Sequence, residues 1–269
     1  MKRMKIFMRR SNELSRKDIL ITLFTSVVVF SLVAYATRKN VFSIFEATKS
    51  NIFSMIMAAV WVGLCATIST WSSEEYHIMP QIKNNLLPVG SYIAGHLCIQ
   101  LGLSAMQALI GTVIYEAFFD YANTGIVFPH VNIEVWLTLF LVIFASATLG
   151  LFVGLLISNI KSAMTVLPLV LIAQLLFSKG IFELENEIER VSNFVVARYG
   201  IAALGSIFDI NQYPIAIKVK YPQVEQVIND LFQMNTEYIL ECWIGLVILA
   251  FVPIVAAYIL LLMKKNKKS

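Results

Sequence analysis

Long apolar runs separated by short polar stretches dominate the hydrophobic pattern of this chain. Six runs contain no formally charged residue: residues 19–37, 50–73, 84–115, 135–160, 162–178 and 242–263. All except 162–178, which is slightly short, reach the roughly 18 to 20 residues that a helix needs to cross about 30 Å of hydrocarbon. The pattern therefore predicts six membrane-spanning helices.

Helices are the only spanning structure that these runs favour. A segment in lipid must satisfy its backbone hydrogen bonds internally, and the alternating pattern of a transmembrane barrel is absent. The composition agrees, because 58% of the residues are hydrophobic and 14% are charged, whereas roughly 25% are charged in soluble domains. The predicted fold class is all-α: a polytopic, multi-pass protein of the cell membrane.

Basic residues concentrate at the two ends of the chain. Residues 1–18 carry seven Lys or Arg, and residues 264–269 carry four. The positive-inside rule places both termini in the cytosol, which agrees with an even number of spans. Beside a membrane span, topology and attraction to anionic membrane lipid explain the basic cluster better than nucleic acid does. Residues 11–18 form either an interfacial helix or a disordered basic tail, and the pattern leaves both open.

A polar stretch at residues 72–92, SSEEYHIMPQIKNNLLPVGSY, lies between two apolar runs on the predicted cytosolic side. Pro88 and Gly90 interrupt it, so we expect residues 72–90 to form a helix along the inner surface that turns into the third span near Ser91. We expect this segment to meet a soluble partner.

The one large hydrophilic segment, residues 179–237, carries eight acids and five bases and is predicted to lie outside. Within it, residues 199–208 are apolar but too few to span, which suits a re-entrant or interfacial helix. Two features of the spans have two interpretations each. Gly150 and Gly154 form a GxxxG pattern that serves either a dimer contact or packing within the chain. Gln174 either marks a pathway or bonds to a neighbouring helix.

Sequence motifs for several kinds of chemistry are absent. There is no GxxxxGK[ST] loop to hold ATP phosphates, and no GxSxG, HExxH or GxGxxG motif. Glu74, Glu75 and His77 resemble the start of an intramembrane metal or acid/base site, but His96 lies about one leaflet away. We therefore predict no catalytic residue, no metal site and no cofactor in this chain.

Several segments, in this order along nearly the whole chain, carry a resemblance to a known family. They are WVGL in the second span, EEYHIMPQIKNNLLPVGSY after it, and SAMQALIG in the third span. Residues 149–182, LGLFVGLLISNIKSAMTVLPLVLIAQLLFSKGIF, and residues 197–204, ARYGIAAL, follow. Together they resemble the type-2 permeases of ATP-binding-cassette (ABC) exporters, especially the G-subfamily-like (White and PDR) branch.

The resemblance implies a transport subunit rather than an enzyme. In such a transporter, two permeases, identical or different, assemble with two copies of a P-loop ATPase subunit, which binds ATP and Mg. It also implies that residues 1–18 form a cytosolic connecting helix, that residues 72–90 form an inner coupling helix, and that the outer segment re-enters the membrane before the last span. The residues that the resemblance makes candidates for contact with the ATPase and for coupling are Glu74, Glu75, His77, Lys83, Pro88 and Gly90.

The resemblance places a substrate path between the second and fifth spans of two permeases. The lining residues expected from it are Trp61, Cys65, Leu171, Gln174 and Phe177. Their apolar character suits amphipathic, lipid-like or peptide cargo, although lipid-facing helices have the same composition. A channel or carrier without an ATPase stays open as an alternative, and an intramembrane enzyme is a weaker one. A channel needs an interior polar row, and beyond Gln100, Gln107 and Gln174 the spans show little of it.

Overall fold

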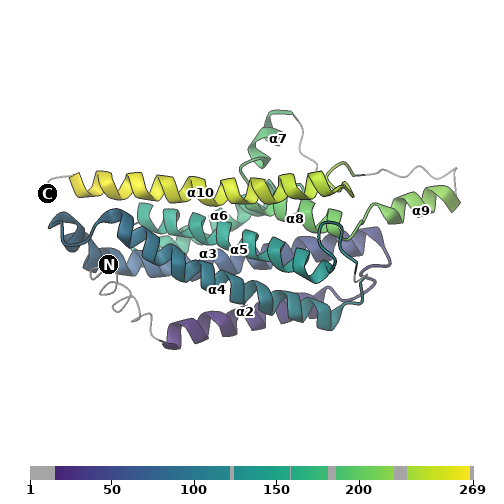
Figure 1. The fold of residues 1–269 in the computed structure, drawn as a ribbon, viewed down its shortest axis with the longest axis horizontal. Helices are drawn as coiled ribbons and strands as arrows, with labels where there is room; N and C mark the ends of the chain where they lie inside the picture. Colours follow the sequence, from purple (N-terminus) through teal and green to yellow (C-terminus); the bar gives the residue numbers. More distant parts are fainter. Residues whose placement is uncertain (1–15, 122–123, 158, 181–185, 221–228, 267–269) are drawn as a thin grey trace.

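The structure is a computed structural model that describes residues 16–121, 124–157, 159–180, 186–220 and 229–266 (Figure 1). In these ranges the side chains of residues 16–18, 69–77, 160, 186–188 and 217–220 are outside the description. Most of the expected connecting helix, residues 1–15, is outside it too. Every regular element in the described ranges is an α-helix.

Nine helices are labelled α2 to α10 in Figure 1. They are α2 (Arg16–Ala36), α3 (Phe45–Lys83), α4 (Val89–Phe118), α5 (Val131–Leu156), α6 (Ile160–Leu176), α7 (Asn186–Ser192), α8 (Val196–Ile207), α9 (Gln212–Lys220) and α10 (Thr236–Asn266). By length and composition, five described helices, α2, α3, α4, α5 and α10, can cross a membrane. The sixth expected span is α6, which has 17 residues. The all-α polytopic fold is confirmed.

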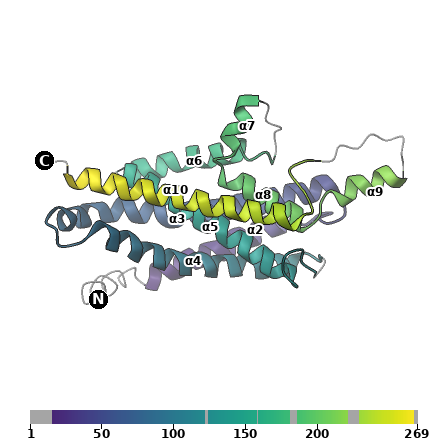
Figure 2. The same ribbon diagram turned by 45° about the horizontal axis from the view of Figure 1, so that its top comes forward.

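Helices α3 and α5 form the centre of the bundle. Their most apolar stretches are 67% buried, whereas those of α2, α4 and α10 are only 17% to 28% buried. Helices α2 and α4 pack on one side of the central pair, and α6 and α8 lie on the other (Figures 1 and 2). The peripheral helices therefore keep apolar faces for lipid, while α3 and α5 supply the core.

Glycines allow α3 and α5 to pack closely. A Cβ atom added to Gly63 would lie 2.4 Å from the carbonyl oxygen of Ile143, and one added to Gly150 would lie 2.4 Å from Thr67 Oγ1. Thr67 Oγ1 donates a hydrogen bond to the carbonyl oxygen of Ala147 at 2.8 Å. Gly150 of the GxxxG pattern therefore serves packing within the chain, where small residues let two backbones approach.

The boundary between the second span and the polar stretch differs from the expected one. Helix α3 continues to Lys83 and contains Pro80 in its last turn; residues 72–83 also include several good helix formers. The chain turns at residues 84–88, where Asn85 adopts a positive φ of 55°. Helix α4 begins at Val89 after Pro88, close to the expected start at Ser91.

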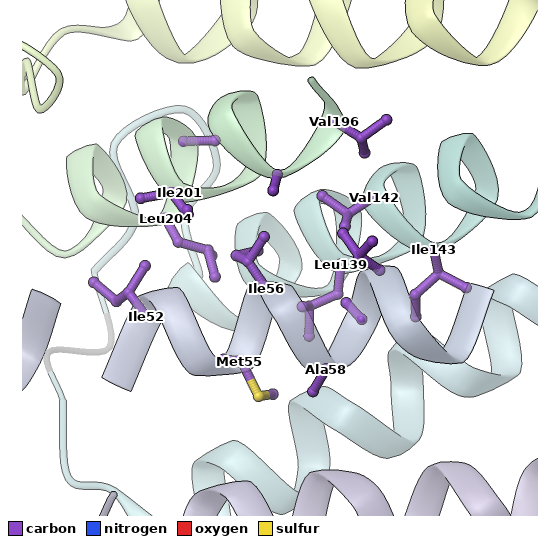
Figure 3. Packing of buried hydrophobic residues seen from close by; sticks show 14 of the residues in the cluster. Ile52, Met55, Ile56, Ala58, Leu139, Val142, Ile143, Val196, Ile201 and Leu204 are labelled. Carbon is purple, nitrogen blue, oxygen red and sulfur yellow. The ribbon is translucent and has the colours of Figure 1, made fainter. Parts of the chain in front are cut away.

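The short apolar helix expected before the last span is α8. It lies inside the bundle, against α3, α5 and α10, at the end opposite the α3–α4 turn (Figure 1). Ile201 and Leu204 of α8 lie with Ile52 and Ile56 of α3 in one apolar cluster (Figure 3). This burial gives a helix that is too short to span a membrane a stable place among the long helices.

Candidate coupling surface and transport path

The described basic residues of the predicted cytosolic side, Lys83, Lys161, Lys264 and Lys265, lie at one end of the bundle. Helix α2 begins there, α10 ends there, and the α3–α4 and α5–α6 turns lie there as well (Figure 1). Lys264 Nζ of α10 donates a hydrogen bond to the carbonyl oxygen of Leu155 at 2.6 Å. A cation at the last turn of α5 also interacts favourably with that helix dipole.

The α3–α4 turn is the most accessible feature of this end that the sequence singled out. Lys83, Pro88 and Gly90 are exposed. Leu86, at the tip, is 67% exposed, although it is a large apolar side chain at a predicted membrane–water boundary. The turn therefore presents an apolar tip beside a single described cation.

A second apolar cluster anchors this turn to the bundle. Ile82 at the end of α3 and Val89 and Tyr92 at the start of α4 are buried with residues of α5 and α10. Within the turn, the backbone N–H of Leu86 donates to the carbonyl oxygen of Gln81 at 2.9 Å. A force on the turn would thus reach four long helices through packed side chains.

The other candidate contact residues are Glu74, Glu75 and His77. They belong to α3, and the structure describes their backbone but not their side chains. Their helix is the same one that forms the bundle centre. The structure therefore connects this stretch to the core by one continuous helix rather than by a hinge.

The candidate path residues lie on two helices that pack together. Trp61 and Cys65 belong to α3, whereas Leu171 belongs to α6 and Phe177 follows its end. All four are partly buried against the main apolar core. Helices α3 and α6 contact each other, but the structure shows a single chain, so a path between two chains stays a prediction.

Gln174 has a different position from these four residues. It is buried, and its Oε1 atom accepts a hydrogen bond from the backbone N–H of Ala197 at 3.2 Å. Ala197 lies in the first turn of α8, whose N-cap residue Val195 makes no side-chain cap. Gln174 therefore satisfies one of the free amide groups at that helix start, which favours the neighbouring-helix interpretation.

A row of buried polar side chains on α4 was not recognised as a row in the sequence. It consists of His96, Gln100, Ser104, Gln107, Thr112 and Tyr115. Steps of three or four residues place His96, Gln100, Ser104 and Gln107 near one face of a helix, so their spacing was a usable signal, whereas the step of five turns Thr112 away from that face. Helix α4 packs on α2 and α5, and hydrogen bonds join the row to Ser26 on α2 and Asn51 on α3.

Glu134, in the first turn of α5, is a buried carboxylate that the sequence reasoning also missed. Its Oε1 atom accepts hydrogen bonds from the backbone N–H groups of Val127 and Phe128 at 2.6 and 2.8 Å. An acid in the first helical turn is favourable for the helix dipole. Glu134 therefore holds the loop before α5 in place.

The surroundings of two acidic residues beyond α6 shift their pKa values. A hydrogen bond of 2.5 Å from Lys179 Nζ lowers the pKa of Glu189. A carboxyl group whose pKa is lowered in the folded state stabilises the fold at pH values above its ordinary pKa. That stability is lost as the pH falls through the lowered pKa. Both groups are partly solvated, so the contribution is small. Burial raises the pKa of Asp209 after α8.

No group of three or more His, Cys, Asp or Glu in the described ranges could hold a metal ion.

Comparisons with known proteins place the chain in a family. A sequence comparison with curated proteins finds no match. The family model for ABC-2 type transporters matches residues 1–207, which include α2 to α8. The chain belongs to the ABC-2 type transporter family and is a membrane-spanning transport subunit.

Proposed function

We propose that this chain is the permease half of an exporter that a separate ATPase subunit powers. The family match over residues 1–207 is the observation that carries the proposal. The sequence given has no P-loop, which supports a separate subunit as the one that binds the ATP and Mg. Two permeases and two ATPase subunits make the complete transporter, and the G-subfamily-like branch is the proposed kinship within the family.

The α3–α4 turn and the end of α3 are the proposed contact for the ATPase. Leu86 and Lys83 are exposed there, and Ile82 and Val89 tie the turn to α5 and α10. Movement of the ATPase pair would press on the turn and tilt α3 and α4 together. Packed helices then move between discrete arrangements, as in other transporters that alternate access.

Amphipathic, lipid-like or peptide molecules are the proposed cargo. The α6 side of the bundle carries the apolar residues Leu169, Ile172 and Leu176, which are exposed. A second permease copy packed on this side would enclose a path lined by apolar side chains from α3 and α6. Such a lining suits cargo with a large apolar part.

Affinity purification of the tagged chain in mild detergent tests the assembly. We expect a P-loop ATPase and a second permease, identical or different, to purify with it. Recovery of the chain with no ATPase from its native membranes would refute the transporter assembly and favour a channel or carrier.

Charge reversal at Glu74→Lys and Glu75→Lys tests the coupling surface. We expect the double variant to accumulate normally but to lose cargo-stimulated ATP hydrolysis, because the reversed charges repel an ATPase surface adapted to acids. The matched control reverses two exposed acids at the other end of the bundle, Glu237→Lys and Glu241→Lys. Unchanged cargo-stimulated ATP hydrolysis in the Glu74/Glu75 variant would show that these two acids do not belong to the coupling surface.

A further inference from the structure

Helix α2 is joined to the bundle by polar side chains as well as by packing. Its apolar stretch is only 17% buried, and it packs on α4 and α3 (Figure 2). At this seam, Ser26 of α2 and Thr37, the residue that follows α2, both hydrogen-bond to buried polar side chains of the neighbouring helices. Hydrocarbon makes such pairs valuable, because an unpaired polar group has no water there.

The hydrogen bonds around Ser26 determine the orientation of the Gln107 amide. Ser26 Oγ donates to the carbonyl oxygen of Thr22 at 2.9 Å, so its only hydrogen is used. The hydroxyl therefore accepts from Gln107 Nε2, 3.1 Å away. This arrangement leaves Gln107 Oε1 as the remaining amide atom, and it has no hydrogen-bond partner among the described residues.

The polar side chains at the other end of the same seam all form hydrogen bonds. Tyr115 donates its hydroxyl to Asn51 Oδ1 at 2.5 Å, and Asn51 Nδ2 donates to Thr37 Oγ1 at 2.7 Å. Thr37 Oγ1 in turn donates to the carbonyl oxygen of Val33 at 2.8 Å. All three of these side chains, those of Tyr115, Asn51 and Thr37, have hydrogen-bond partners. The fully buried Gln107 Oε1 atom, which has none among the described residues, is therefore an exception at this seam.

The position of Gln107 restricts what could reach it. At about 1.5 Å per residue, it lies roughly 27 Å along α4 from Val89 and 16 Å from Phe118, which is within the hydrocarbon. Apolar side chains face outward nearby, Phe24 on α2 and Met106 and Leu109 on α4. A ligand that enters here from the lipid phase needs an apolar body and one polar group.

Three further observations describe the surroundings of Gln107. Residues 19–37 and 84–115 contain no Lys, Arg, Asp or Glu, so α2 and α4 offer an ionic head group no counter-charge at this depth. On the inner side, Gln100 Nε2 donates to Ser104 Oγ at 3.2 Å, which continues the polar row toward Gln107. On the outer side, the Phe30 ring fills the space at Gly111, where an added Cβ would lie 3.2 Å from it.

We propose that Gln107 Oε1 is the acceptor of a binding site between α2 and α4 for the hydroxyl group of a long-chain amphiphile from the bilayer. A hydroxyl supplies the missing donor without a charge, and its chain stays against the exposed side chains of α2 and α4. Helix α2 moves aside to admit the ligand. The site is on the opposite side of α3 and α5 from α6, and binding to it requires neither the ATPase nor the proposed transport path.

Photolabelling of the full chain in lipid nanodiscs tests this site. The probes are a dodecanol with a diazirine in its chain and the methyl ether of the same alcohol, which has no donor. We expect the alcohol to label peptides of α2 and α4 about fivefold more than the ether, the ratio that one neutral hydrogen bond supports. Equal labelling by both probes would overturn the proposal and leave the oxygen to a buried water.

Three variants separate the acceptor from the helix contact. Gln107→Leu should reduce alcohol labelling to the level of the ether. Ser26→Ala removes the α2 contact but keeps Oε1, and it should keep the labelling. Thr112→Val is the matched control, because the Thr112 hydroxyl bonds within its own helix to Ala108. Loss of labelling in Ser26→Ala as well would show that only the helix contact matters. If Gln107→Leu does not fold, the alcohol-to-ether ratio of the unmodified chain decides.

Discussion

Gly63 lies where α3 and α5 approach closely, and its missing side chain is the reason that they can. An added Cβ would lie 2.4 Å from the carbonyl oxygen of Ile143 and 2.9 Å from the Ser146 side chain. The first neighbour is backbone, so it cannot rotate away. Even one methyl group here would force the two central helices apart.

We predict that Gly63→Ala lowers the free energy of unfolding by about 1 to 3 kcal/mol, the usual cost of overpacking. Thermal or SDS unfolding of the purified chain in detergent measures it. Gly102→Ala is the control, because no atom lies within 4 Å of its added Cβ, and alanine is the better helix former. Equal effects of the two substitutions would contradict close packing at Gly63.

At the scale of elements, α8 depends on a neighbouring helix for its start. Val195 provides no side-chain cap, and Gln174 of α6 accepts from the Ala197 amide instead. Gly200 brings α8 close to both central helices, since its added Cβ would lie 2.7 Å from Val142 and 3.0 Å from Ile56. A short buried helix is thus held by one polar contact and one close approach.

We predict that Gln174→Leu lowers the free energy of unfolding by about 0.5 to 2 kcal/mol, the range for a lost helix cap. Gln174→Glu should keep most of the stability, because a carboxylate still accepts from the amide and suits a helix N-terminus. Unfolding in detergent measures both variants. Equal losses in the two would show that the contact with Ala197 contributes little.

At the scale of the whole molecule, the position of α6 makes it the proposed neighbour of a second permease. Leu169 and Ile172 of α6 are exposed, and Phe24 of α2 is exposed on the opposite side of the central pair. Both surfaces are apolar, so composition alone does not separate a subunit contact from a lipid contact. Only a measurement of proximity does.

Cysteine cross-linking in membranes supplies that measurement. In a chain whose Cys65, Cys98 and Cys242 are replaced by alanine, Leu169→Cys or Ile172→Cys should form a covalent dimer on oxidation. Phe24→Cys is the matched control and should stay monomeric. Cross-linking from α2 but not from α6 would place the second permease on the other side and refute the proposed path.

The class of fold was within reach of the sequence, since charge-free runs of spanning length require helices in lipid. The family was within reach only through the ordered segments that resemble type-2 permeases, and the family match over residues 1–207 agrees with it. The sequence allowed two interpretations of the role of some residues. Gln174 is one example, because its sequence position does not show that α8 starts beside it. The polar row of α4 is another, because its spacing indicated one face but not the helix that covers it.

The sequence by itself determined that this chain is a bundle of membrane helices, because burial in hydrocarbon acts on each run independently. Only the tertiary structure decided which helices are central, that α3 runs on to Lys83, and that Gln107 Oε1 has no hydrogen-bond partner among the described residues. Those properties depend on contacts between residues far apart in the chain. For example, Ser26 and Gln107 are 81 positions apart, a relation that local periodicity does not encode.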